Sequence, residues 1–169
     1  VARFEAERQA LALMDHPSIA KVLDGGATQT GLPYFVMELV RGMKITDYCD
    51  EAKLSTRARL DLFVQVCQAI QHAHQKGIIH RDIKPANLMV APSGDPVVLD
   101  FGLARMAESD GESPAPALTR DGEVFGTPAY MAPEQLSGGA SDSDARADVW
   151  ALGVSLHEAL AGERPFQSE

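Results

Sequence analysis

The residues best suited to chemistry lie together in the segment His80-Arg81-Asp82-Ile83-Lys84-Pro85-Ala86-Asn87. It places an acid, a lysine and an amide close together, in the order that phosphoryl transfer needs. The Asp82 carboxylate can orient or deprotonate a hydroxyl, the Lys84 ammonium can neutralise developing charge, and the Asn87 amide oxygen can bind a metal ion. An ordinary polar turn between a helix and a strand uses the same residue types, so the segment alone leaves both interpretations open.

Two further motifs follow in the chain. Asp100-Phe101-Gly102 comes directly after a short apolar run, and Ala132-Pro133-Glu134 closes a long polar segment. Each motif alone is weak, because an Asp-Phe-Gly triplet is as often a plain turn as a functional one. Their order and spacing relative to Asn87 favour a shared function.

In this order, the three motifs resemble the catalytic loop, the Asp-Phe-Gly motif and the Ala-Pro-Glu motif of a eukaryotic-type protein kinase domain. The motif sequences resemble those of bacterial members. The resemblance implies an ATP-dependent phosphotransferase with an α+β, two-lobed fold. It also implies catalytic roles for Asp82, Lys84, Asn87 and Asp100, with Asn87 and Asp100 holding Mg²⁺.

The resemblance also indicates which type of residue accepts the phosphoryl group. Serine/threonine kinases carry a lysine at the position of Lys84, and the run Gly126-Thr127-Pro128-Ala129-Tyr130-Met131-Ala132-Pro133-Glu134 is similar to their substrate-receiving segment. The implied partner is therefore a protein that offers a serine or threonine hydroxyl.

A nucleotide site is also implied, by position rather than by side-chain chemistry. Glu7 lies ten residues before Pro17, where kinases place the glutamate that pairs with a lysine of the preceding strand. The run Met37-Glu38-Leu39-Val40 resembles the hinge, in which the Glu38 carbonyl and the Val40 amide bind adenine and Met37 closes the rear pocket. Lys84 and Met89 complete the implied nucleotide contacts. Asp148 resembles the aspartate that braces the catalytic loop through backbone N–H groups.

Hydrophobic periodicity and turn residues predict the elements that must position these groups. We expect helices over residues 4–14, 55–76 and 144–161, and strands over residues 20–23, 34–39, 87–90 and 97–99. The pattern places Cys67 in the core and directs four residues of the last helix inward: Val149, Leu152, Leu156 and Leu160. The resemblance divides the chain into a partial N-lobe with the start of the hinge (residues 1–40) and a partial C-lobe (residues 41–169), truncated at both ends.

Composition limits the function classes. With 169 residues, 45% of them hydrophobic, the chain is long enough to bury one core. Its net charge is −9, and residues 85–169 hold 4 basic against 14 acidic side chains, which argues against a nucleic-acid partner. The only cysteines, Cys49 and Cys67, lack metal-binding spacing. No signal peptide and no apolar run near the roughly 20 residues that span a bilayer is present, so we expect a cytoplasmic segment without membrane contact.

The 169 residues contain neither a G-x-G-x-x-G loop nor a Val-Ala-Ile-Lys motif. We therefore expect this segment by itself to be inactive. Two alternatives stay open: a pseudokinase that binds nucleotide or a partner without transfer, and a small-molecule phosphotransferase. The intact set Asp82, Lys84, Asn87 and Asp100 argues against the first, and the 126–134 segment argues against the second. Activation by dimerisation also stays open.

Overall fold

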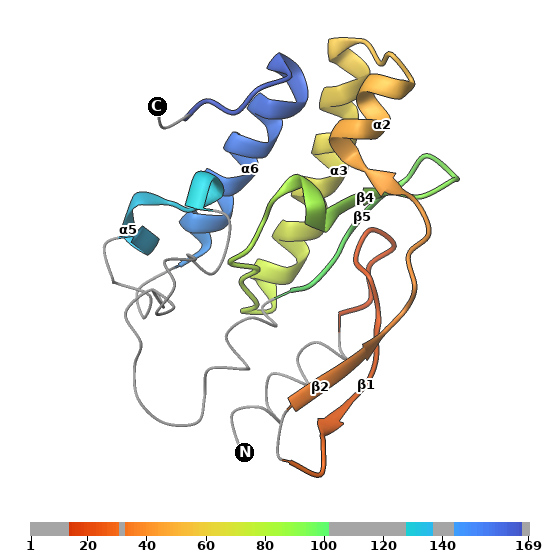
Figure 1. Cartoon of the computed structure of the whole chain (residues 1–169), viewed down its shortest axis with the longest axis vertical. Helices are drawn as coiled ribbons and strands as arrows, with labels where there is room; N and C mark the ends of the chain where they lie inside the picture. Colours follow the sequence, from red (N-terminus) through yellow and green to blue (C-terminus); the bar gives the residue numbers. More distant parts are fainter. Residues whose placement is uncertain (1–13, 31–32, 102–127, 137–143, 167–169) are drawn as a thin grey trace.

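The computed structural model describes residues 14–30, 33–101, 128–136 and 144–166. Three sequence expectations lie outside these ranges: Glu7, the helix over residues 4–14 apart from the non-helical Met14 at its end, and residues 126–127 of the substrate-receiving segment. The described residues form a small β-hairpin and a larger, mainly helical part (Figure 1).

The hairpin consists of strands β1 (Val22–Ala27) and β2 (Pro33–Met37), which pair antiparallel. The segment before β1 is fastened to the helical part by backbone hydrogen bonds. The Ala20 N–H donates to the Val98 carbonyl and the Val98 N–H donates to the Ser18 carbonyl, both at 2.9 Å. The hairpin is thereby connected to the strand that leads into Asp100 and Phe101.

A second, three-stranded antiparallel sheet has the order β3-β4-β5, and the loop that contains Asp82 and Asn87 leads into its central strand, β4. Its strands are β3 (Met43–Lys44), β4 (Leu88–Val90) and β5 (Pro96–Val98). The strands β4 and β5 form a tight hairpin, with Leu88 opposite Val98. A short 3₁₀ turn, Pro85–Asn87, precedes β4 directly, so the geometry of Asn87 is set by the start of that strand.

Two long helices, α3 (Thr56–Gln75) and α6 (Ala145–Ala161), lie beside each other (Figure 1), and α3 also contacts β5 of this sheet. Each begins at a residue whose side chain accepts a backbone hydrogen bond, Ser55 from Ala58 N–H and Asp144 from Arg146 N–H. A left-handed glycine, Gly162 at φ +77°, follows α6. Both helices match their predicted ranges to within one residue at each end.

The core lies between α3, the β3-β4-β5 sheet and α6. Its members share near-complete burial and come from all three elements and from the loop before β4. Among them are Val66, Ile70, Ile83, Leu88 and Val98, each no more than 2% exposed. Ile83 and Leu88 flank the Lys84–Asn87 segment, so burial of two apolar side chains fixes the polar stretch between them.

Each of the four predicted strands has a counterpart among the described residues, but the ends of these strands are shifted. The first strand is β1 at Val22–Ala27 rather than residues 20–23, because residues 18–20 pair instead with Val98. Among the described residues, the unpredicted elements include the two-residue β3 and the seven-residue helix α2 (Ile45–Glu51) that follows it. A second short helix, α5 (Pro133–Leu136), was also not predicted and follows a 3₁₀ turn at Pro128–Tyr130.

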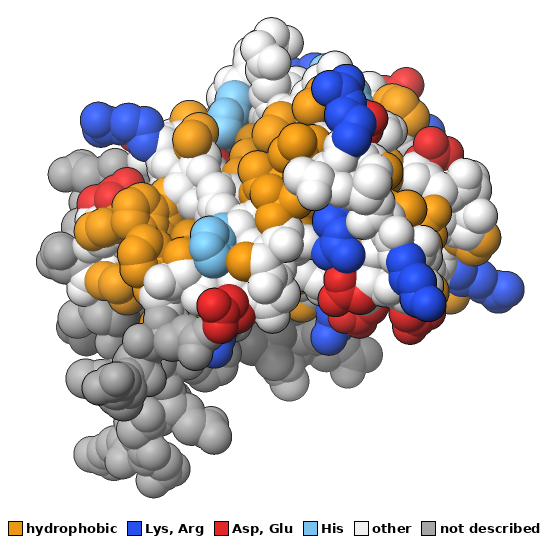
Figure 2. All heavy atoms as spheres, turned by 90° about the horizontal axis from the view of Figure 1, so that it is seen from above, with side chains coloured by type: hydrophobic (Ala, Val, Ile, Leu, Met, Phe, Trp, Pro, Cys, Tyr) orange, Lys and Arg blue, Asp and Glu red, His pale blue; other side chains and the backbone are white. Residues whose placement is uncertain are grey.

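Several side chains predicted to point inward lie at the surface. Cys67 is exposed, and Val149 and Leu160 are 62% and 42% exposed, whereas Leu152 is buried and Leu156 is half-buried. The helix itself was predicted correctly from its periodicity. Periodicity alone, however, does not show how much of a helix surface is buried against other elements. Figure 2 shows hydrophobic side chains gathered into exposed areas on one face of the molecule, with charged side chains around them.

The approach of Gly42 to β4 gives a prediction about stability. A Cβ at Gly42 would lie 2.2 Å from the Val90 carbonyl oxygen and 2.9 Å from its carbon, both backbone atoms. Because backbone cannot swing aside as a side chain can, Gly42→Ala is expected to lower the free energy of unfolding by about 1–3 kcal/mol. Chemical denaturation of the purified protein measures this change.

Gly153 provides the matched control, because a Cβ there meets nothing within 4 Å on an exposed turn of α6. Gly153→Ala is expected to raise the free energy of unfolding by roughly 0.5–1 kcal/mol, since alanine is the better helix former. Equal effects of the two substitutions would contradict the close approach of Gly42 to β4.

Candidate active site

The Asp82 carboxylate is the centre of a compact polar cluster. Its Oδ2 accepts a hydrogen bond from Lys84 Nζ at 2.8 Å and another from Asn87 Nδ2 at 3.1 Å. The Asn87 Nδ2 also donates to the Asp82 backbone carbonyl at 2.8 Å. The Asp82 side chain remains 37% exposed, so it is held in place yet open to a reactant. The structure thus brings together three of the four predicted catalytic residues.

The His80 side chain is buried at the start of this loop and has a structural role. It is 1% exposed; its Nε2 lies 2.8 Å from the Leu99 carbonyl and its Nδ1 accepts the Asp82 N–H at 3.3 Å. A carbonyl can only accept, so Nε2 carries the proton and the ring is neutral. Burial, the main influence, lowers the pKa of His80, and the neighbouring Asp148 charge opposes that shift. The ring therefore serves as a fixed spacer beside Asp82.

Asp148 braces the loop from α6. This carboxylate is fully buried, and it accepts the His80 N–H on Oδ2 at 2.8 Å and the Arg81 N–H on Oδ1 at 2.7 Å. Arg81 has φ +68°, a left-handed conformation that is unfavourable for a residue with a Cβ. The two hydrogen bonds stabilise this turn directly before Asp82. The sequence-based expectation for Asp148 is therefore confirmed.

Asp100 and Phe101 follow strand β5, from which they are separated only by Leu99. The Leu99 N–H donates to the Asn87 carbonyl at 2.9 Å, which ties the two predicted metal-binding segments together one residue before Asp100. Asp100 is exposed and also adopts a left-handed φ of +57°. The Phe101 ring is buried and packs against the His80 ring with centroids 4.7 Å apart. Strained backbone of this kind is typical of functional turns.

The donor set fits Mg²⁺ better than a transition metal. The Asn87 side-chain hydrogen bonds found among the described residues are both donated by Nδ2, which leaves the amide oxygen as a candidate metal ligand. The described residues contain no group of three His, Cys, Asp or Glu side chains that could form a closed metal site. One carboxylate and one amide oxygen suit a metal ion that takes its remaining ligands from water and phosphate, which is how Mg²⁺ is usually bound.

The predicted hinge residues follow β2. The Glu38 N–H donates to the Lys21 carbonyl at 3.0 Å, and the Lys21 N–H donates to Glu38 Oε1 at 2.9 Å. Within the described residues, no hydrogen bond uses the Glu38 carbonyl or the Val40 N–H. These are the two groups expected to meet adenine. The side chains of Met37 and Met89 are half-buried, the first at the end of β2 and the second in β4.

The segment around α5 makes two contacts that the sequence did not indicate, one from Gln135 to the catalytic loop and one from Tyr130 to α6. Gln135 donates from Nε2 to the Arg81 carbonyl at 3.3 Å and accepts the Ala132 N–H at 2.9 Å. Tyr130 donates to Glu158 Oε2 at 2.5 Å, and burial together with this hydrogen bond raises the pKa of Tyr130. Neither contact follows from periodicity or motif, because each joins residues far apart in the chain.

Comparisons with known proteins agree with this geometry. The family model described as "Protein kinase domain" matches residues 2–169. The serine/threonine-protein kinase PknB of Mycobacterium tuberculosis is 40% identical over 171 residues, which cover 99% of this chain and 26% of that protein. PknB of Mycolicibacterium smegmatis is 41% identical, covering 97% of this chain and 26% of that protein.

PknA of M. tuberculosis is 38% identical over 174 residues, covering all of this chain and 38% of the relative. The chain thus spans about a quarter to two fifths of these curated relatives. No helix among the described residues is long and apolar enough to cross a membrane. With the motifs, the braced loop and the family match in agreement, the chain belongs to the protein kinase domain family, with the expected α+β fold.

Proposed function

We propose that this chain is the catalytic part of a protein kinase that transfers the γ-phosphate of Mg-ATP to serine or threonine hydroxyls. The observation that carries the proposal is the Asp82 carboxylate, held by Lys84 and Asn87 on a loop braced by buried Asp148. Phosphoryl transfer needs positioning and charge neutralisation more than covalent chemistry, and this cluster supplies both.

Each side chain has a distinct part in the proposed reaction. Asp82 orients the acceptor hydroxyl and takes its proton as the oxygen attacks the γ-phosphorus. Lys84, 2.8 Å from Asp82, neutralises charge on the transferring group. Asn87 and Asp100 provide the oxygen ligands for Mg²⁺, whose charge lowers the repulsion between the phosphates and the nucleophile.

We place the adenine at the hinge, against the Glu38 carbonyl and the Val40 N–H, with Met37 and Met89 as apolar neighbours. Glu7 is proposed to hold the lysine of the preceding strand. The chain is divided, in this proposal, into N-lobe residues 1–40 and C-lobe residues 41–169. The proposed place of action is the cytoplasm.

Two observations favour serine or threonine as the acceptor. Lys84 lies directly beside the Asp82 carboxylate, at the position where serine/threonine kinases resemble this chain in carrying a lysine. The curated relatives are named serine/threonine-protein kinases. Activation by a second copy of the protein is compatible with this proposal and is tested separately by the dependence of activity on protein concentration.

The test uses the whole protein, [γ-³²P]ATP and Mg²⁺ with two peptide libraries, one with serine and threonine and one with tyrosine as the only acceptors. Phosphoamino-acid analysis is expected to find label on serine or threonine and none on tyrosine. Label confined to tyrosine would contradict the acceptor assignment. ATP binding with no label in either library would contradict the proposed transfer.

A further inference from the structure

The backbone carbonyl of Arg81 accepts a hydrogen bond from outside the catalytic loop. The Gln135 Nε2 donates to this carbonyl at 3.3 Å, and the Arg81 N–H donates to Asp148 Oδ1 at 2.7 Å. Arg81 has the left-handed φ of +68° and directly precedes Asp82. A strained residue keeps its conformation only where its surroundings hold it. Asp148 therefore holds this turn through its N–H, and Gln135 holds it through its carbonyl.

The two partners of Gln135 fix the orientation of its amide. The Ala132 N–H donates to Oε1 at 2.9 Å, whereas the Arg81 carbonyl can be met only by the NH₂ group. Ala132 is fully buried, so its N–H needs an acceptor within the protein. The half-buried Gln135 side chain thus uses both ends of its amide to join the substrate-receiving segment to the catalytic loop.

Helix capping explains only half of this arrangement. Gln135 is the third residue of α5, and Ala132 directly precedes that helix. A glutamine at this position commonly reaches back to the N–H before the helix, as in one half of a capping box. Capping uses Oε1 alone, and a glutamate serves it equally well. The contact of Nε2 with Arg81, 54 residues earlier in the chain, is therefore not a capping contact.

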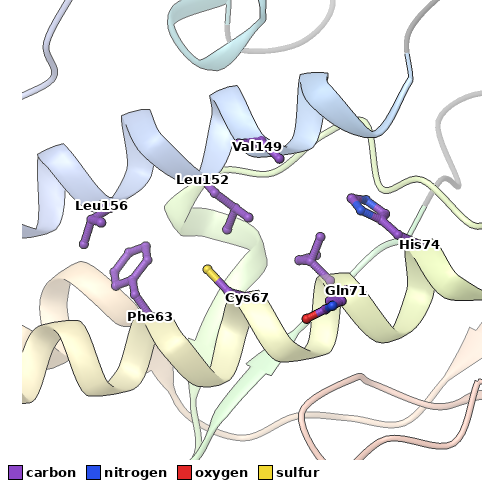
Figure 3. A pocket seen from close by; sticks show the side chains of 8 residues that line it. Phe63, Cys67, Gln71, His74, Val149, Leu152 and Leu156 are labelled. Atoms are coloured by element: carbon purple, nitrogen blue, oxygen red, sulfur yellow. The ribbon is translucent and has the colours of Figure 1, made fainter.

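A second attachment of the same segment ends at a different place. Tyr130 donates to Glu158 Oε2 on α6. This helix is held against α3 by apolar side chains, among them Phe63 and Leu156, which point toward one another from the two helices (Figure 3). Tyr130 thus attaches the segment to a helix with its own apolar packing, whereas Gln135 attaches it to the strained turn of the catalytic loop.

We propose that Gln135 is a positioning residue for phosphoryl transfer. It fixes the Arg81 carbonyl, and through that peptide Asp82, relative to the segment that receives the substrate. A misplacement of about 1 Å between reacting groups costs on the order of a hundredfold in rate, so this relation matters for transfer. Gln135 itself touches no reactant. The activity arm of this proposal rests on the proposed function, whereas its structural arm concerns only the turn at Arg81.

The experiment compares three variants of the whole protein. Gln135→Glu keeps an oxygen for the Ala132 N–H, but its carboxylate cannot donate to the Arg81 carbonyl. Gln135→Ala removes both contacts. Gln68→Glu makes the same change of charge at an exposed position of α3. Site-resolved hydrogen exchange measures the protection of the Arg81 and Ala132 amides, and steady-state kinetics with Mg-ATP and a serine peptide give kcat and KM.

Gln135→Glu is expected to lower kcat and the protection of the Arg81 amide by about three- to tenfold, the usual effect of losing one hydrogen bond. The protection of Ala132 should stay at the wild-type level, because the carboxylate still accepts its N–H. Gln135→Ala should lower kcat by a similar factor and lower the protection of Ala132 as well. The KM for ATP should stay unchanged in both variants, because the hinge is formed by other residues. Gln68→Glu should change none of these quantities.

Three results would overturn the proposal. Wild-type kcat and wild-type Arg81 protection in Gln135→Glu would limit Gln135 to capping α5. Equal losses in Gln68→Glu and Gln135→Glu would indicate an effect of charge alone. An equal fall of Ala132 protection in both Gln135 variants would trace the loss to the cap. A wild-type protein without transferase activity would refute the proposed function instead, and the exchange of the Arg81 amide would still decide whether Gln135 holds the turn.

Discussion

Asp148→Asn is expected to lower the free energy of unfolding by about 3 kcal/mol or more and to abolish most catalytic activity. The carboxylate accepts backbone N–H groups on both of its oxygens inside a fully buried site. An amide has only one acceptor oxygen, so its NH₂ group faces one of these donors and leaves a buried N–H unsatisfied. The left-handed turn at Arg81 then loses one of its two supports. Urea unfolding followed by circular dichroism measures the stability change.

Asp144→Asn serves as the control on the same helix. Asp144 is exposed and caps α6 through the Arg146 N–H, a contact that asparagine can also make. This variant is expected to retain nearly wild-type stability and activity. If Asp148→Asn unfolds at the same urea concentration as Asp144→Asn, then the buried carboxylate does not brace the loop.

Asp82→Asn is expected to reduce kcat in the whole protein by about 10²–10⁴-fold, the usual contribution of a positioned proton acceptor. The substitution preserves shape but removes the negative charge that pairs with Lys84 and receives the hydroxyl proton. Because Asp82 does not contact the hinge, the affinity for ATP should remain close to wild type. Steady-state kinetics give kcat, and titration with a fluorescent ATP analogue gives the affinity.

Asp95→Asn, an exposed position in the turn between β4 and β5, is the matched control and should leave kcat unchanged. A result in which Asp82→Asn loses ATP binding and kcat together would indicate that the residue holds the nucleotide. That outcome would assign the proton acceptor elsewhere.

Much of the central site was predictable because the chain places its members close together. Asp82, Lys84 and Asn87 lie within six residues, and a 3₁₀ turn between buried Ile83 and Leu88 suffices to join them. The long helices were predictable for a similar reason: their periodic apolar residues and their caps are local signals.

Contacts between distant segments were not predictable from local patterns. His74 belongs to none of the motifs that the sequence indicates, yet its side chain meets that of Asp148, 74 residues further along the chain. Gln135 was not singled out, yet it donates to the Arg81 carbonyl. The exposure of Cys67 and Val149 was missed because periodicity locates a helix face without showing how much of that face another element covers. Strand ends shifted where residues 18–20 paired with Val98 instead.

The most direct test of the central claim is a single-turnover measurement with the whole protein. Enzyme in excess over Mg-[γ-³²P]ATP is mixed rapidly with a serine peptide, and the rate of label transfer is followed by chemical quenching. The loop geometry predicts transfer to the serine hydroxyl by the wild-type protein, and a transfer step slowed by about 10²–10⁴-fold in Asp82→Asn. Equal single-turnover rates for the two proteins would contradict the assignment of Asp82 as the group that orients and deprotonates the acceptor.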